Sequence, residues 1–170
     1  MNKSIFYKFG FFALCLMLFT FVSNAQQEKA SPARTAEGTV NGAKIKISYS
    51  SPAVKGRTIW GDLVPFGKVW RAGANEATIF ETDKDIQVQG KPLKAGKYSF
   101  FVIPGENEST AIFNAETGQW GTNYDQSKDV LRVQVPSTKT SSFEERLVYE
   151  VTKNGFEMRW ADGKGEVQIK

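Results

Sequence analysis

The residues best suited to chemistry lie in one stretch, residues 49–78, which contains Arg57, Trp70, Arg71, Asn75 and Glu76. An arginine guanidinium is a planar fork that holds a carboxylate or a phosphate through two parallel hydrogen bonds. Glycines and an asparagine in the same stretch tolerate the backbone conformations of a tight bend. We therefore predict a connected polar cluster of Arg71, Asn75 and Glu76, with Trp70 packed against it and Arg57 nearby.

Two interpretations of this polar cluster remain open. In the first, the cluster satisfies backbone groups of an irregular loop as a buried structural network, and this is the version that we favour. Arg71→Ala would then leave a buried carboxylate unpaired and cost about 3–5 kcal/mol of stability. In the second, the cluster binds a ligand, and the same change would abolish binding with little effect on the melting temperature.

The four tryptophans, Trp60, Trp70, Trp120 and Trp160, also have two interpretations. They could form a flat platform on which sugars or aromatic ligands stack. A tryptophan in an all-β protein more often fills the core while its indole N–H donates to a carbonyl. We favour core packing for each of them.

The residue types that the chain lacks exclude several kinds of chemistry. There is no histidine, and the one cysteine is Cys15 near the amino terminus. Catalytic triads, histidine general bases, and histidine or thiolate metal sites are therefore excluded. We expect no cofactor and no metal site. The catalytic option that remains is a pair of carboxylates, as in glycosidases, with Glu76 and either Asp62 or Glu81 as candidates.

The first 25 residues have the features of a signal peptide. Lys3 and Lys8 precede an apolar run over residues 9–22, and Ser23 and Ala25 are small residues at the two positions read by a signal peptidase. The run has 14 residues, whereas a helix needs about 20 to cross a bilayer. We predict cleavage before Gln26, export to the periplasm or the extracellular space, and no membrane attachment after cleavage.

The charge of the chain argues against a nucleic-acid partner. The full sequence has 22 basic and 18 acidic residues, and removal of Lys3 and Lys8 leaves 20 against 18, a net charge of +2. A balance so close to neutral, without a basic cluster, does not attract a phosphate backbone. The remaining length is that of a single domain.

The hydrophobic pattern after the leader is that of β-strands. Residues 44–50 alternate strictly between polar and apolar, and Asn41-Gly42 before them is a strong signal for a two-residue hairpin. Residues 77–81 and 86–89 are predicted to form a second hairpin, and a strand over 130–135 is predicted to end at Pro136. About ten such segments predict an all-β, antiparallel β-sandwich of the jelly-roll kind over residues 38–170, after a flexible lead-in at 26–37.

Several sequence blocks resemble a known family. These are SPAR at residues 31–34, YSSPAVKGR, LVPFGKVWRAGANEAT, AGKYSFFVIPG and FNAETGQWG. Together they are similar to the domain-of-unknown-function family 2911 over essentially the whole chain after the leader. One departure is Ser51, where that family often has an arginine. The resemblance implies an exported bacterial protein and brings no established activity.

Two classes of function follow from these observations. The first is a non-catalytic binding or structural module of the periplasm or cell surface, whose partner would be an unknown small molecule or glycan. The alternative is a histidine-free hydrolase that acts on glycans through paired carboxylates. Glu76 and Glu81 are separated by an odd number of residues, so they would face opposite sides of one strand, and we favour the binding or structural module.

Overall fold

The computed structural model describes residues 30–170, so the predicted signal peptide and cleavage site lie outside the described residues. The predicted all-β class is confirmed. Nine strands and one short 3-10 turn, η1, make up the regular structure of this part of the chain. Their bounds are β1 Ala33–Val40, β2 Ala43–Ser50, β3 Thr78–Thr82, β4 Ile86–Val88, β5 Lys91–Leu93, β6 Gly96–Ile103, β7 Glu108–Asn114, η1 Gln126–Lys128, β8 Asp129–Thr152 and β9 Gly155–Gln168.

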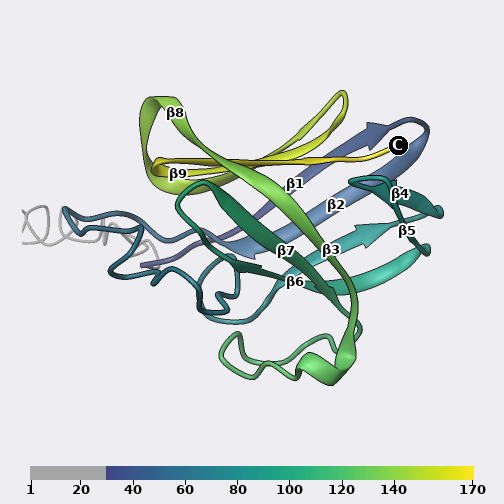
Figure 1. Ribbon diagram of the computed structural model, residues 1–170, viewed down its shortest axis with the longest axis horizontal. Helices are drawn as coiled ribbons and strands as arrows, with labels where there is room; N and C mark the ends of the chain where they lie inside the picture. Colours follow the sequence, from purple (N-terminus) through teal and green to yellow (C-terminus); the bar gives the residue numbers. More distant parts are fainter. Residues whose placement is uncertain (1–29) are drawn as a thin grey trace, which may run out of the picture.

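Seven of the strands form one antiparallel sheet in the order β1-β2-β3-β6-β7-β8-β9, and β4 and β5 pair separately. The sheet curls until it is nearly closed into a barrel (Figure 1). The order in the sheet follows the order in the chain, apart from the β4–β5 insertion. A jelly roll passes repeatedly between two separate layers. This sheet instead runs from each strand to its neighbour, so the two layers around the core are halves of one curved sheet.

The barrel closes where the chain near β1 and β2 meets β8. The backbone N–H of Val54 donates to the carbonyl of Glu145 at 2.7 Å, and Leu147 donates to Pro52 at 3.0 Å. The hydroxyl of Ser51 donates to the carbonyl of Leu147 at 2.7 Å and is fully buried. Ser51, at which the chain departs from the family that its sequence resembles, thus joins the seam of the barrel.

The alternation in β2 sets the core face. Ile45, Ile47 and Tyr49 are buried and the residues between them are more exposed, as predicted. Asn41 and Gly42 both have positive φ angles, 49° and 83°, and Val40 pairs with Ala43. This is the predicted two-residue hairpin. The sheet begins earlier than expected, because β1 includes residues 33–37, which the sequence pattern places in the lead-in.

Two other local predictions are corrected by the pairing of the strands. The segments that were expected to pair as a hairpin do not, because β3 pairs with β2 and β6, while β4 pairs with β5 across Gln89 and Gly90. The strand expected to end at Pro136 continues through it. Pro136 is exposed, and Ser137 donates its N–H to Asn107, so the ladder resumes directly after the proline.

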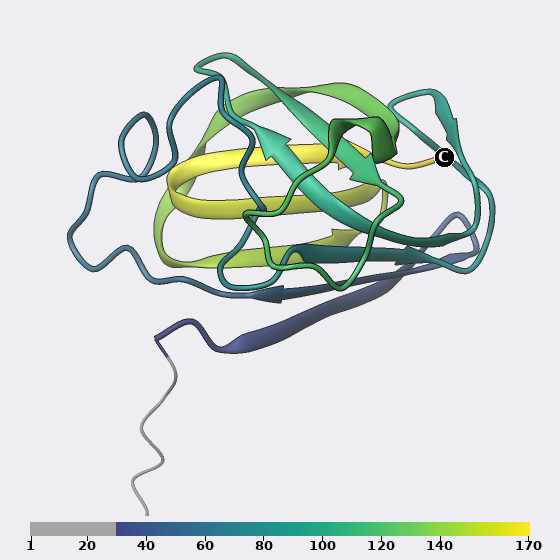
Figure 2. The same ribbon diagram turned by 90° about the horizontal axis from the view of Figure 1, so that it is seen from below.

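The two ends of the barrel differ in what surrounds them. The carboxyl terminus and β4–β5 lie at one end, where Gln87 and Lys170 exchange backbone hydrogen bonds. The long irregular segment of residues 51–77 extends beyond the opposite end (Figure 2). Over residues 30–170 there is no helix with the length and apolar character needed to span a bilayer. The functional residues predicted from the sequence belong to the irregular segment.

Candidate functional site

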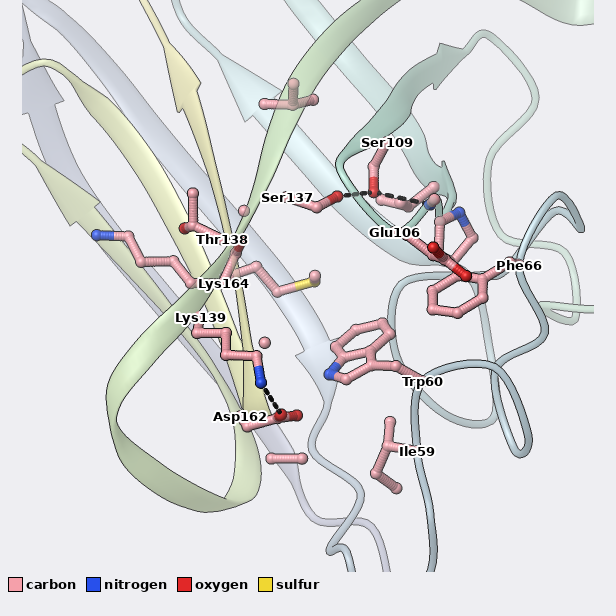
Figure 3. A pocket seen from close by; sticks show the side chains of 18 of the residues that line it. Ile59, Trp60, Phe66, Glu106, Ser109, Ser137, Thr138, Lys139, Asp162 and Lys164 are labelled. Carbon is pink, nitrogen blue, oxygen red and sulfur yellow. Dashed lines mark hydrogen bonds and ion pairs between the residues drawn. The ribbon is translucent and has the colours of Figure 1, made fainter.

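A cavity of about 690 Å³ opens at the end of the barrel beside the irregular segment. Its walls come from this segment, from the turn between β6 and β7, and from the middle of β8 and β9 (Figure 3). Segments that are far apart in the sequence therefore build one hollow. The volume is within the range of about 300–1,000 Å³ that small-molecule sites occupy.

The inner wall of the cavity is apolar. It consists of buried, inward-facing side chains from four strands: Phe100, Val102, Ala111, Val135, Phe156, Met158 and Val167. Among these inward-facing side chains Ala111 is short and three are valines, and Gly165 adds no side chain. The inward-facing side chains of a small barrel normally fill its interior. Here they leave a hollow, because they have too little volume to meet across the barrel.

Three tryptophans pack together against this wall. The ring of Trp70 stacks on that of Trp160 with centroids 5.8 Å apart, and Trp60 meets both edge-on. Trp60 lines the cavity and donates its indole N–H to the carbonyl of Trp160 at 3.1 Å. A Cβ at Gly163 would collide with the Trp60 indole, so a glycine is needed there. Core packing is thus the role of these three, while Trp120 is 50% exposed.

The rim of the cavity carries hydroxyls and charges. Ser109 and Ser137 share a hydrogen bond of 2.7 Å between their hydroxyls, and the N–H of Gly105 donates to Ser109 at 3.3 Å. The ammonium of Lys139 lies 3.9 Å from the carboxylate of Asp162 (Figure 3). Both charged side chains are mostly exposed, so they contribute little to stability and remain available to a ligand.

Arg57 lines the same cavity, but its guanidinium is engaged by its own loop. Its Nε donates to the carbonyl of Val54 at 2.9 Å and its Nη2 to that of Ala53 at 2.6 Å. These bonds lie within the irregular segment, next to the residues that pair with β8 at the barrel seam. Arg57 thus lies at the mouth of the barrel, and not within the predicted cluster around Arg71.

Trp70 and Arg71 do lie together, in a smaller pocket on the outer side of the barrel with Gly121 and Tyr124. The indole N–H of Trp70 donates to the carbonyl of Gly73 at 3.2 Å. Burial lowers the pKa of the Arg71 guanidinium, because water is removed from the charged group. The structure thus brings together two of the five predicted residues.

Asn75 and Glu76 have other partners. The side-chain amide of Asn75 donates to the Ser50 hydroxyl at 3.2 Å, and its positive φ of 60° forms the expected bend. Glu76 is exposed and pairs through its backbone with Trp120. Among the described residues, no hydrogen bond or ion pair joins Arg71 to Asn75 or to Glu76, so the bend forms without the expected side-chain network.

The carboxylates considered for hydrolysis lie outside both pockets. Glu76 and Asp62 are exposed on the irregular segment, and Glu81 lies 3.9 Å from the ammonium of Lys97 on the next strand. The carboxylates on the rim of the barrel cavity are Glu106 and Asp162. Over residues 30–170, no three side chains of the histidine, cysteine, aspartate and glutamate types gather in a metal-binding group.

Comparison with known proteins places the chain in a family. The family model described as "Protein of unknown function (DUF2911)" matches residues 31–169. The chain belongs to this family. The DUF2911 match spans the whole barrel, including the irregular segment that borders the cavity. No curated protein and no solved structure matches the chain.

One polar network of this DUF2911 domain was not found from the sequence. The carboxylate of Asp129, almost fully buried, accepts from the Tyr124 hydroxyl at 2.6 Å, from Arg132 at 2.7 Å and from Asn114 at 2.8 Å. The network fixes the segment before β8 over the outer face of β6, where Tyr124 packs edge-on against Phe101 with centroids 5.0 Å apart. The spacing of Asp129 and Arg132 is an ordinary surface pattern, so only the fold shows that the pair is partly buried.

Proposed function

We propose that this protein is an exported, non-catalytic binding module that holds a small, largely apolar molecule in the open end of its barrel. The observation that carries the proposal is the cavity of about 690 Å³ with apolar walls and a polar rim. Most ligand sites combine a concave apolar surface with a few polar groups that fix the orientation of the ligand.

The walls indicate how such a ligand would lie. Its apolar part would contact Val102, Val135 and Val167, above a floor formed by Phe100 and Phe156. Burial of apolar surface is worth about 25 cal/mol per Å² before the cost of association is subtracted, so a medium-length chain or a small ring system suits the volume.

The rim would receive the polar end of the ligand. The Ser109–Ser137 hydroxyl pair can exchange its internal hydrogen bond for bonds to a ligand oxygen. Lys139 and Asp162 provide one charge of each sign, which suits a hydroxyl or a single acidic group better than a highly charged ligand. Trp60 stands in the wall, where a bound ligand would change its fluorescence.

Titration of tryptophan fluorescence with decanoic acid, decanol and a phenyl glycoside tests this proposal. We expect saturable changes for at least one of the three, with the apolar chain required. Ala111→Phe places a ring in the cavity and should weaken that binding at least tenfold. Ala95→Phe adds the same ring at an exposed position outside the cavity and should leave the affinity unchanged.

The titration can also reject the proposal. No saturable response to any of the three probes, or equal affinity in the wild type and Ala111→Phe, would show that the barrel interior is not the binding site. If Ala111→Phe does not fold, Val135→Phe on the neighbouring strand β8 replaces it as the filling variant.

The proposed export has its own measurement, the mass of the protein recovered from the periplasm or the medium. We expect a chain that begins at Gln26, because the small residues Ser23 and Ala25 precede the cleavage point. An intact amino terminus on the recovered protein, or a lipid on Cys15, contradicts this part of the proposal.

A further inference from the structure

A second pocket, of about 360 Å³, lies on the outer side of the barrel, and Trp70 in its lining packs against Trp60 of the barrel cavity. It forms between the chain segment that starts at Val69 and the loop that follows Trp120. Its lining residues are Val69, Trp70, Arg71, Gly121, Thr122 and Tyr124. Arg71 is the charged residue of this lining, and none of the six is acidic. The barrel cavity shares none of these residues, so the two sites are separate.

Arg71 is held in this pocket without a counter-charge. Its Nε is buried and has no hydrogen-bond acceptor among the described residues, and no ion pair to Arg71 occurs within residues 30–170. Removing a guanidinium from water is unfavourable unless an anion or several acceptors replace the lost hydration. Arg71 meets this cost in part, since Nε is buried without an acceptor, while the two terminal nitrogens are not among the buried unpaired atoms and stay open to a ligand.

The surrounding backbone is shaped around this side chain. A Cβ at residue 121 would collide with Cδ and Cβ of Arg71, so only glycine lets the loop close over the arginine. Gly121 also donates its N–H to the carbonyl of Asn75 at 3.0 Å, which fixes the loop in place. Tyr124, in the same lining, is anchored by its hydrogen bonds to Asp129 and Arg132. The loop thus closes directly over Arg71, and a second lining residue is fixed by its own partners.

We propose that the Arg71 pocket binds the oxyanion, a carboxylate or a phosphate, of a small molecule. The guanidinium supplies the positive charge and its planar fork matches two oxygens of such a group. The hydroxyl of Thr122 is a second polar group of the lining, and the rings of Trp70 and Tyr124 bound the space beside it. This site does not depend on ligand binding in the barrel.

The side-chain Nε–Hε resonance of Arg71, followed by NMR in 15N-labelled protein at pH 6, reports on this site directly. Succinate, inorganic phosphate and perchlorate are titrated separately at constant ionic strength. We expect a saturable shift with succinate or phosphate and none with perchlorate at the same concentrations. A response to succinate alone identifies a carboxylate site, and a response to phosphate alone identifies a phosphate site.

Two arginine variants complete the test. Arg71→Lys keeps the charge but loses the planar fork, and it should weaken binding of the active anion at least tenfold. Arg34→Lys changes an exposed arginine on β1 that lines neither pocket, and it should bind like the wild type. A shift that never saturates, or unchanged affinity in Arg71→Lys, overturns the proposal. If Arg71→Lys does not fold, the wild-type resonance alone decides, because it observes the guanidinium itself.

Discussion

The middle of the barrel and its open end are built from the same alternating strands, yet one is packed and the other is hollow. In the middle, Phe80 meets Phe113 and Phe156 with ring centroids 5.0 and 5.6 Å apart, and all three are buried. At the open end, inward positions carry Ala111 and valines, and a cavity of about 690 Å³ remains. Alternation decides which side chains face inward, but their volume decides whether the interior is closed.

Phe156 marks the boundary between the two regions. It touches the aromatic cluster and also forms the floor of the cavity. A rigid floor suits a ligand site, because a site held by packed elements needs less reorganisation when a ligand enters. The packed middle therefore accounts for most of the stability, whereas the open end provides the space for the proposed ligand.

The largest expected effect tests the packed middle. Phe80→Ala removes a fully buried ring from the aromatic cluster and should lower the free energy of unfolding by about 3–5 kcal/mol, measured by urea denaturation. Phe143→Ala, at a side chain that is 62% exposed, is the control and should change it by less than about 0.5 kcal/mol. Equal losses of unfolding free energy in the two variants would show that the middle and the rim contribute equally to stability.

The next effect extends the comparison to the outer layer. Asp129→Asn replaces two acceptor oxygens with one, so the Tyr124 hydroxyl and Arg132 lose a charged partner. We expect a loss of about 1–3 kcal/mol in the same urea experiment, because a partly buried donor is left unsatisfied. An unchanged stability would mean that the segment over β6 contributes nothing, and the inner core alone holds the fold.

The pH dependence of stability gives a third test of the packed interior. Burial raises the pKa of Tyr149 well above its ordinary value of 10.0. Above about pH 10 the unfolded chain loses this proton and the folded chain keeps it, so stability falls as the pH rises. The slope for one such group is at most about 1.4 kcal/mol per pH unit. Tyr149→Phe should make the fall in stability between pH 10 and 11.5 shallower.

This third prediction has a clear contrary result. The fall will not vanish in Tyr149→Phe, because burial also raises the pKa values of Tyr98 and Tyr124. The variant also loses the 2.8 Å hydrogen bond from the Tyr149 hydroxyl to Ala72, so only the slopes are compared. Identical slopes in the variant and the wild type would show that Tyr149 ionises as easily in the folded protein as in the unfolded chain.

The smallest expected effect on stability concerns the open end. Ala111→Phe adds a ring to space that is already empty, so it should change the free energy of unfolding by less than about 1 kcal/mol, although it should block the proposed ligand site. The same enlargement in a tightly packed core typically costs about 1–3 kcal/mol. A loss above about 3 kcal/mol would indicate that this end is as tightly packed as the middle.

Local patterns in the sequence determined the class of the fold and part of its detail. The strict alternation of residues 44–50 places Ile45 and Ile47 inward in the structure, and Asn41-Gly42 forms the predicted hairpin. These predictions succeed because a period of two and a two-residue turn are set by a few neighbouring residues. The absence of histidine likewise limits the chemistry of the protein, whatever fold the chain adopts.

Only the tertiary structure decided how the segments combine. It extends the strand predicted over residues 130–135 into the long β8, pairs β4 with β5, and gathers cavity residues from Arg57 to Val167 around one hollow. Short inward residues such as Ala111 and Val135 were the signal in the sequence for that hollow. They could not be interpreted alone, because a small side chain leaves a cavity only if no other residue reaches across.

The segment around Arg71 also separates what the sequence determines from what the tertiary structure decides. Its residue types identified an unusual site, but the sequence could not choose the partners of Arg71, Asn75 and Glu76. Gly121 packs against Arg71, Ser50 accepts from Asn75, and Trp120 pairs with Glu76. These residues become neighbours only when the chain folds. Residue types set what a side chain can bind, whereas contacts between distant segments decide what it meets, and those contacts arise only when the whole sheet closes.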